Sequence, residues 1–209
     1  MASNKVNKNN ASSQIDAPRI RLCDYRSIKL SDLDIAHAKA TARESKEISP
    51  EEETFVYLLT TTYVDMIVEN SEVYVPQPIV RERAIDMAMA LERNLERAGK
   101  TLKEYYEGTN SDEESLIKGF EKDALRQLEG RYALLAIART QGLTCTKREY
   151  TDELKRLSEM YLTPDLDKLA EYLKQAGEEK KIKDDISINK ASKYIEKLVR
   201  KQLEEKGQL

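Results

Sequence analysis

The sequence predicts an all-α fold: a helical body with projecting helical-hairpin arms and a short extended segment near the N-terminus. Charged residues make up 35% of the 209 residues, while glycine and proline number only 7 and 5, as is typical of long, solvated helices. Apolar residues recur at spacings of three and four along most of the chain. Pairs of the form Ser/Thr-x-x-Glu, typical of helix starts, stand between these runs.

Composition and charge exclude several classes of protein. Acidic and basic residues are interspersed and the formal net charge is -3, so the chain has no basic surface of the kind that binds nucleic acid. No apolar run approaches the roughly 18 residues that a membrane-spanning helix needs. The two cysteines, Cys23 and Cys145, do not form a disulfide framework, and two reduced thiols or one pair both remain open.

The chain divides into three predicted regions. Residues 1–18 are polar and rich in Asn, Ser and Lys, which predicts a disordered leader without the apolar stretch of a signal peptide. Residues 19–48 are expected to hold a short strand and a helix capped by Ser31. Residues 49–206 are expected to form the helical domain. Its first helix starts with Ser49 as N-cap, Pro50 at the first helical position and Glu52 closing a capping box.

The helical domain contains a series of further helix boundaries. The helix that follows Glu52 is apolar almost all round, so we expect it to be buried on more than one side. One later helix, ending near Gly142, should run for about 30 residues, or about 45 Å, which is too long for a compact bundle unless the helix projects. The predicted boundaries are a C-cap at Gly99, starts at Thr101, Ser111 with Glu114, Thr146 with Glu149, and Thr163-Pro164, an end at Gly177, and a last helix that frays after Val199.

The stretch "VENSEVYVPQPIVRERA", residues 68–84, interrupts two helical runs. Residues before a proline are pushed out of the helical region, so 73–75 should be extended. Pro76 and Pro78 prevent the two helices from fusing, and Pro78 suits the start of the second helix. We therefore expect a hinge that sets the angle between the body and an arm.

Side chains capable of catalysis are sparse. The one histidine, His37, has no carboxylate or cysteine at a metal-ligand spacing, and phosphate-binding and nucleophile-elbow motifs are absent from the sequence. Cys145 stands at a predicted helix start, where the pKa of a thiol can be lowered, although an incidental thiol is the simpler interpretation. We therefore expect no catalytic residue, no metal site and no cofactor.

Tyrosine is over-represented among the aromatic residues, with 11 Tyr against 2 Phe and no Trp. Tyrosine at a half-buried position is ordinary packing, but it also supplies amphipathic contact area at low entropy cost. Tyrosines near helix ends and hairpin tips, together with one leucine, are therefore candidates for binding other polypeptides: Tyr105, Tyr106, Tyr132, Leu135, Tyr161 and Tyr172.

The order of segments resembles a known family. Over residues 49–198 the chain is similar to the C-terminal, SurA-like chaperone domain of trigger factors. The resemblance lies in "VENSEVYVPQPIVRERAIDM", the Gly-closed helix before "TLKEYYEGTNSDEESLIKGF", the long helix through "ALLAIA" and "GLTCTKREYTDELKRLSEMY". "LCDYRSIKL" resembles the stretch that leads into the isomerase domain of that family.

The resemblance implies a helical cradle that binds unfolded or nascent polypeptides without ATP. Only about 20 residues separate the lead-in from Ser49, whereas an isomerase domain needs on the order of 100, so the sequence lacks that domain. It also lacks the N-terminal ribosome-binding domain. Isomerase activity and ribosome docking are therefore not expected.

Alternatives stay open at this point. A scaffold that binds one specific partner would reuse the same fold, and narrow helix seams suit homodimerisation as well as client binding. Residual prolyl isomerase activity is a weaker alternative, because the chain has no Trp and few residues outside helices.

The sequence as written is compatible with a cytoplasmic protein. Related lipoprotein-like chains begin in a similar way, so a bacterial cell-surface lipoprotein without its export signal is the alternative.

Overall fold

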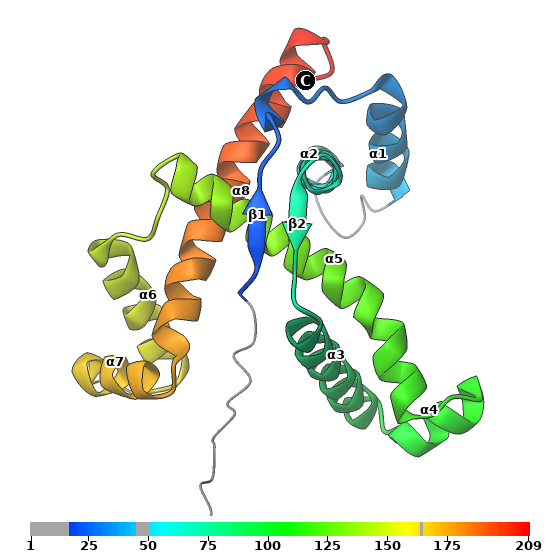
Figure 1. Ribbon diagram of the computed structural model, residues 1–209, viewed down its shortest axis with the longest axis vertical. Coiled ribbons are helices and arrows are strands. Elements are labelled where there is room, and N and C mark those ends of the chain that lie inside the picture. Colours follow the sequence, from blue (N-terminus) through cyan, green and yellow to red (C-terminus); the bar gives the residue numbers. More distant parts are fainter. Residues whose placement is uncertain (1–16, 45–50, 164) are drawn as a thin grey trace, which may run out of the picture. The chain divides into compact units, whose positions relative to one another are not determined.

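The computed structural model describes residues 17–44, 51–163 and 165–209, and they form a mainly helical fold (Figure 1). The described chain contains eight α-helices and two strands of three residues each, so the prediction of an all-α fold is confirmed. In chain order the elements are β1 Arg19–Arg21, a 3-10 helix Tyr25–Ser27, α1 Asp32–Glu44, α2 Glu51–Glu69, β2 Glu72–Tyr74, α3 Gln77–Arg97, α4 Leu102–Thr109, α5 Glu113–Thr140, α6 Lys147–Met160, α7 Leu166–Gln175 and α8 Glu178–Glu205.

The helices belong to two compact units. The small unit is Val75–Ala124, which holds α3, α4 and the first part of α5, and the described residues 17–18 before β1 are assigned to it as well. The large unit is Arg19–Tyr74 with Leu125–Leu209, which holds all the other elements. The division crosses the chain just after β2 and again within α5.

The core of the large unit is built by α1, α2, α8 and the C-terminal half of α5. Most apolar side chains of α2 pack into the core, where Leu59, Tyr63 and Ile67 are fully enclosed, but Tyr57 of the same helix is 69% exposed. Ala133 and Ile137 of α5 and a stripe of α8 complete the cluster; the α8 residues are Ala191, Ile195, Val199 and Leu203.

The lead-in before α1 is part of this core. Leu30 is buried against the cluster, and the Ser31 hydroxyl accepts from the Asp34 N–H at 3.1 Å, which confirms Ser31 as the N-cap of α1. The short predicted strand forms as β1, and it pairs with β2 in antiparallel register with Ile20 opposite Val73. The sequence predicted an extended segment before Pro76 but not this pairing.

The small unit is a helical hairpin with a short third helix. Its buried side chains are few and come from α3, α5 and the segment before α3: Val75, Pro76, Val80, Ala84, Leu116, Ile117 and Ala124. Arg81 of α3 reaches Glu114 at 2.8 Å and Glu121 at 3.6 Å on α5. α3 ends at Arg97 with Ala98 as its C-cap, one residue before the predicted Gly99. Gly99 follows with a φ of 71°, and the Lys100 N–H closes the helix on the Leu95 carbonyl.

Two predicted helix starts are wrong by one or two residues. Asp112, not Ser111, caps α5, because its carboxylate accepts from the Ser115 N–H at 2.8 Å. The Ser111 N–H instead closes α4 on the Tyr106 carbonyl, and Glu114 turns to Arg81.

Asp165 likewise caps α7 in place of Thr163, and it accepts from the Lys168 N–H at 3.1 Å. The Thr163 N–H closes the preceding helix on the Ser158 carbonyl, so this residue belongs to the end of α6. In both cases the residue chosen from the sequence serves the helix before it.

Among the other predicted helix boundaries, one more is wrong, at the end of the last helix. The capping boxes at Thr101 with Glu104 and at Thr146 with Glu149 are present, and α5 runs for 28 residues. The last helix does not fray after Val199, because Gln202 and Leu203 are buried and α8 continues to Glu205. The predicted cap at Ser49-Pro50 and the proline at 164 lie outside the described residues.

Candidate functional site

Titratable and nucleophilic side chains do not gather into a site within the described residues. Searching that part of the chain finds no group of three or more His, Cys, Asp or Glu side chains that could hold a metal ion. His37 is exposed on α1, and both cysteines are free thiols. Burial, with the nearby Glu149 carboxylate adding to it, raises the pKa of the Cys145 thiol. The less favoured interpretation, a thiol whose pKa the helix start lowers, is therefore wrong.

The most perturbed carboxyl group among the described residues is structural. The pKa of Glu149 is lowered to about 2 because its carboxylate accepts from the Thr146 backbone N–H, from Lys190 and from the Thr146 hydroxyl. Lys190 Nζ lies 2.9 Å from Glu149 Oε1, and it also donates to the Thr144 carbonyl at 3.0 Å. These contacts fasten the start of α6 to α8.

The predicted binding residues divide into exposed and packed groups. Tyr161 and Tyr172 are 65% and 67% exposed, at the end of α6 and within α7. Tyr132 is half-buried on α5, and Leu135 on the same helix is only 5% exposed. These four residues belong to the large unit, where Tyr161 and Tyr172 present open apolar surface.

The turn between α6 and α7 exposes three consecutive large side chains. Met160 is 55% exposed and Leu162 is 88% exposed, on either side of Tyr161. Sequence reasoning missed Met160 and Leu162, although a helix end at "EMYLTP" without a glycine was a usable signal. We call Met160, Tyr161 and Leu162 the tip triplet.

The backbone at the tip triplet follows a common helix-ending pattern with an uncommon residue. The Thr163 N–H donates to the Ser158 carbonyl at 2.9 Å and the Leu162 N–H to the Glu159 carbonyl at 3.4 Å. Leu162 has a φ of 53°, in the left-handed region. Helix ends of this kind usually carry glycine or asparagine at that position.

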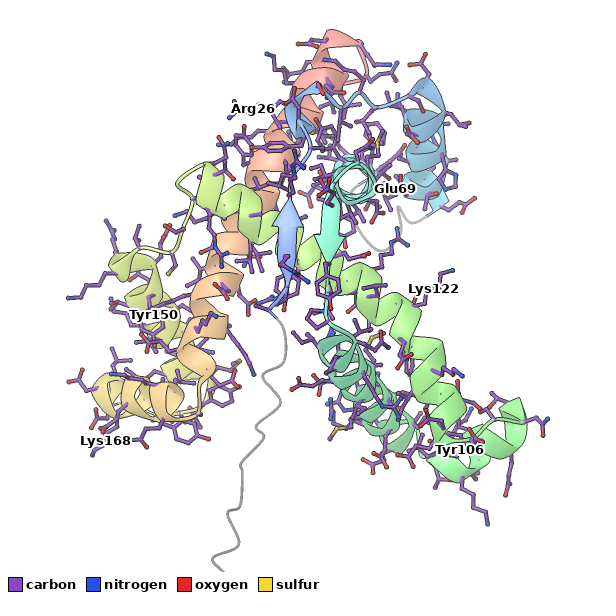
Figure 2. The ribbon with its side chains drawn as sticks, in the orientation of Figure 1. Arg26, Glu69, Tyr106, Lys122, Tyr150 and Lys168 are labelled. Atoms are coloured by element: carbon purple, nitrogen blue, oxygen red, sulfur yellow. The ribbon has the colours of Figure 1, made fainter. Side chains whose placement is uncertain are left out.

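The small unit exposes a second set of apolar side chains. Ile85 and Met89 are one helical turn apart on α3 and are 40% and 49% exposed. On α4 the half-buried Tyr105 and Tyr106 stack edge to face, with ring centroids 6.1 Å apart (Tyr106 is labelled in Figure 2). Burial raises the pKa of Tyr106, and the carboxylates of Glu113 and Glu92 add to the effect.

Fold and surface together define the class of this protein. It is an all-α protein of helical hairpins that exposes large apolar side chains at a hairpin turn and along a helix face. Residues 35–197 match the family model described as the C-terminus of the bacterial trigger factor protein. The chain belongs to this family, which is a family of chaperones.

Individual relatives agree with this assignment. The trigger factor of Natranaerobius thermophilus is 30% identical over 128 residues, which cover 61% of this chain and 28% of the relative. The trigger factor of Bacillus pumilus is 29% identical over 63% of this chain and 30% of its own. That of Geobacillus kaustophilus is 27% identical over 80% of this chain and 37% of its own. The chain thus spans about a third of the length of these curated relatives, and no solved structure matches it.

Proposed function

We propose that this protein is an ATP-independent holdase chaperone that binds apolar segments of unfolded or nascent polypeptides. The observation that carries the proposal is the tip triplet, three consecutive large side chains that are 55%, 65% and 88% exposed in a chain of the trigger factor family. Apolar surface gathered at one place on a protein marks an interaction site.

The chemistry of these side chains suits varied clients. Methionine is flexible and polarisable, and tyrosine adds a rigid ring with a polar tip. Covering apolar area is worth about 25 cal/mol per Å², so a handful of such contacts holds a segment weakly and releases it quickly. Neither ATP nor a covalent step is required.

The predicted binding residues have different parts in this proposal. Tyr161 and Tyr172 offer contact area directly, with Met160 and Leu162 beside Tyr161 in the chain. Tyr105 and Tyr106 offer the exposed parts of two half-buried rings on α4. Tyr132 and Leu135 lie in the more packed part of α5, and they support α5 rather than contact the client.

A light-scattering assay tests the function. A chemically denatured model client is diluted into buffer without nucleotide, in the presence of a few-fold molar excess of this protein. We expect aggregation to be delayed in proportion to the amount of chaperone. Aggregation at the same rate as with an inert protein would contradict the proposal.

The same preparation separates the competing functions. A single tight partner in a pull-down, without effect on generic clients, would favour a specific scaffold. We expect no acceleration of isomerisation in a proline-peptide assay and no co-sedimentation with ribosomes, since the matched part of the family is the C-terminus.

A further inference from the structure

Six of the eight described helices, α3 to α8, are each followed closely by a residue in the left-handed conformation, and one of these six residues is unusual. Four such positions are glycines with φ between 63° and 74°, namely Gly99, Gly142, Gly177 and Gly207. In the described residues two others have positive φ: Asn110 at the end of α4 and Leu162 at the end of α6. Leu162 alone of these six carries a large apolar side chain.

Folding by itself does not favour leucine at this position. A residue with a Cβ is strained in the left-handed region, whereas glycine is free of this strain and asparagine tolerates the region better. The two backbone hydrogen bonds that close α6 involve the N–H groups of Leu162 and Thr163, and glycine or asparagine would make them equally well. Because the Leu162 side chain is 88% exposed, burial does not compensate for the strain.

We propose that Leu162 is a contact residue of the chaperone surface and inserts into an apolar segment of an unfolded client. This inference rests on the proposed function and adds to it the residue on which client affinity at the α6–α7 turn depends. A strained backbone that persists without a packing reason is a common sign of a functional position.

The chemistry of the turn indicates what Leu162 contacts. Residues 160–163, Met-Tyr-Leu-Thr, carry no formal charge, and the first three are all exposed. An uncharged, apolar surface of this kind is complementary to an uncharged, apolar stretch of polypeptide. An unfolded chain exposes such stretches, whereas a folded protein buries them.

Substitutions at Leu162 separate stability from binding. Leu162→Gly and Leu162→Asn both relieve the strain and remove the apolar side chain, and asparagine does so without adding the flexibility of glycine to the unfolded chain. We expect both variants to fold at least as stably as the natural chain, with a folded-to-unfolded ratio raised up to about fivefold. We expect the chaperone concentration that halves client aggregation to rise at least about threefold, the loss of one buried leucine contact.

Two further variants are controls. Leu162→Met keeps a large apolar side chain and should hold clients nearly as well as the natural chain. Leu33→Ala removes a leucine that is 79% exposed on α1 of the same unit, and it should leave client holding unchanged.

The outcomes distinguish this inference from the function on which it rests. If the natural chain delays aggregation and the glycine and asparagine variants delay it equally, the inference is wrong and the proposed function stands. If the natural chain does not delay aggregation, both the proposed function and the inference are wrong. If both variants are less stable than the natural chain, the strain argument fails. If both shift a dimer to monomer in sedimentation while holding is unchanged, the contact is with a second copy and not with a client.

Discussion

At the scale of single residues, the carboxylate of Glu149 combines two tasks. It closes the capping box at the start of α6, and it receives Lys190 from α8. Both partners favour the ionised form, which explains the pKa of about 2. Because the folded state binds a proton less readily than the unfolded state, Glu149 stabilises the fold fully above its ordinary pKa of 4.5. That contribution is lost as the pH falls toward 2.

We therefore expect Glu149→Gln to lower the free energy of unfolding at pH 7 by roughly 1 kcal/mol. This is less than the pKa displacement alone implies, because the side chain is 37% exposed and solvent screens the pair with Lys190. The difference between variant and natural chain should shrink as the pH is lowered from 4.5 toward 2. Urea unfolding at a series of pH values measures it.

Glu104→Gln is the matched control for that experiment. Glu104 occupies the same capping-box position in α4, with Thr101 as its partner, and the pKa of Glu104 is lowered chiefly by the Thr101 backbone N–H. We expect a smaller effect than at Glu149, whose ammonium partner lies at hydrogen-bonding distance. Equal effects of the two substitutions would show that Lys190 adds nothing.

The caps also show how far residue-level prediction reaches. Thr101 and Thr146 were identified because a threonine cap at a helix start is a local pattern of a few residues. Asp112 and Asp165 were missed because each follows a second candidate, and only the structure shows that this candidate is engaged by the preceding helix.

At the scale of elements, the lead-in before α1 is held by groups from distant helices. Gln202 of α8 accepts from the Leu30 N–H at 3.0 Å and donates to the Ile28 carbonyl at 2.8 Å. The buried Tyr63 hydroxyl of α2 donates to the Tyr25 carbonyl at 2.7 Å. Arg26, labelled in Figure 2, donates to Tyr194 of α8 at 3.1 Å.

Removing the Gln202 amide should loosen this segment. Gln202→Leu leaves the buried Leu30 N–H without its partner and the Ile28 carbonyl with only the Tyr63 hydroxyl at 3.3 Å, which we expect to cost about 2 kcal/mol of unfolding free energy. Hydrogen exchange of the Leu30 amide measures the local effect, and urea unfolding the global one.

Gln175→Leu serves as the comparison, because Gln175 lies exposed on α7 and should tolerate the change within about 0.5 kcal/mol. An unchanged exchange rate at Leu30 in Gln202→Leu would contradict the assigned role of the amide.

Element prediction succeeded where the periodic signal was long. The long helix was expected at about 30 residues and has 28, since its apolar spacing repeats over many turns. The pairing of β1 with β2 was missed because strands of three residues carry too little alternation to choose a partner. The persistence of α8 beyond Val199 was missed because burial of Gln202, a polar residue, depends on the lead-in.

At the scale of the whole molecule, the Pro76 and Pro78 segment coincides with a change of unit. The small unit begins at Val75, immediately after β2, and α3 starts at Gln77 with Pro78 in its first turn. We propose that the two prolines restrict the orientation of the small unit. Replacing both with alanine should broaden the distribution of distances between labels on α3 and α8, measured by fluorescence transfer, and change the small-angle scattering profile.

Pro18→Ala, just before β1, is the control for general effects of losing a proline. Profiles that are the same for the double variant and the natural chain would rule out the hinge. A broadened distance distribution in the control alone would assign the restriction to the lead-in instead.

The family and the all-α class were accessible from the sequence, whereas the exposed surface was not. Periodicity identifies which residues are apolar, but it does not say whether a leucine faces a core or solvent. Leu135, chosen as a candidate, is 5% exposed, and Leu162, not chosen, is 88% exposed. The difference depends on which helices cover each position, and that is a tertiary property.

In the described chain no helix is long and apolar enough to span a bilayer.

The long-range closure of the large unit has a consequence for biosynthesis. Its core joins Leu30 and Tyr63 to Ile195, Val199 and Leu203, across more than half of the sequence. A ribosome delivers these segments many seconds apart, since translation adds roughly 5–20 residues each second. Until α8 emerges, α2 lacks the part of its apolar cover that α8 supplies, and the Leu30 N–H lacks the Gln202 side chain. A member of a chaperone family would then itself depend, for that interval, on being shielded by another chaperone or on folding after release.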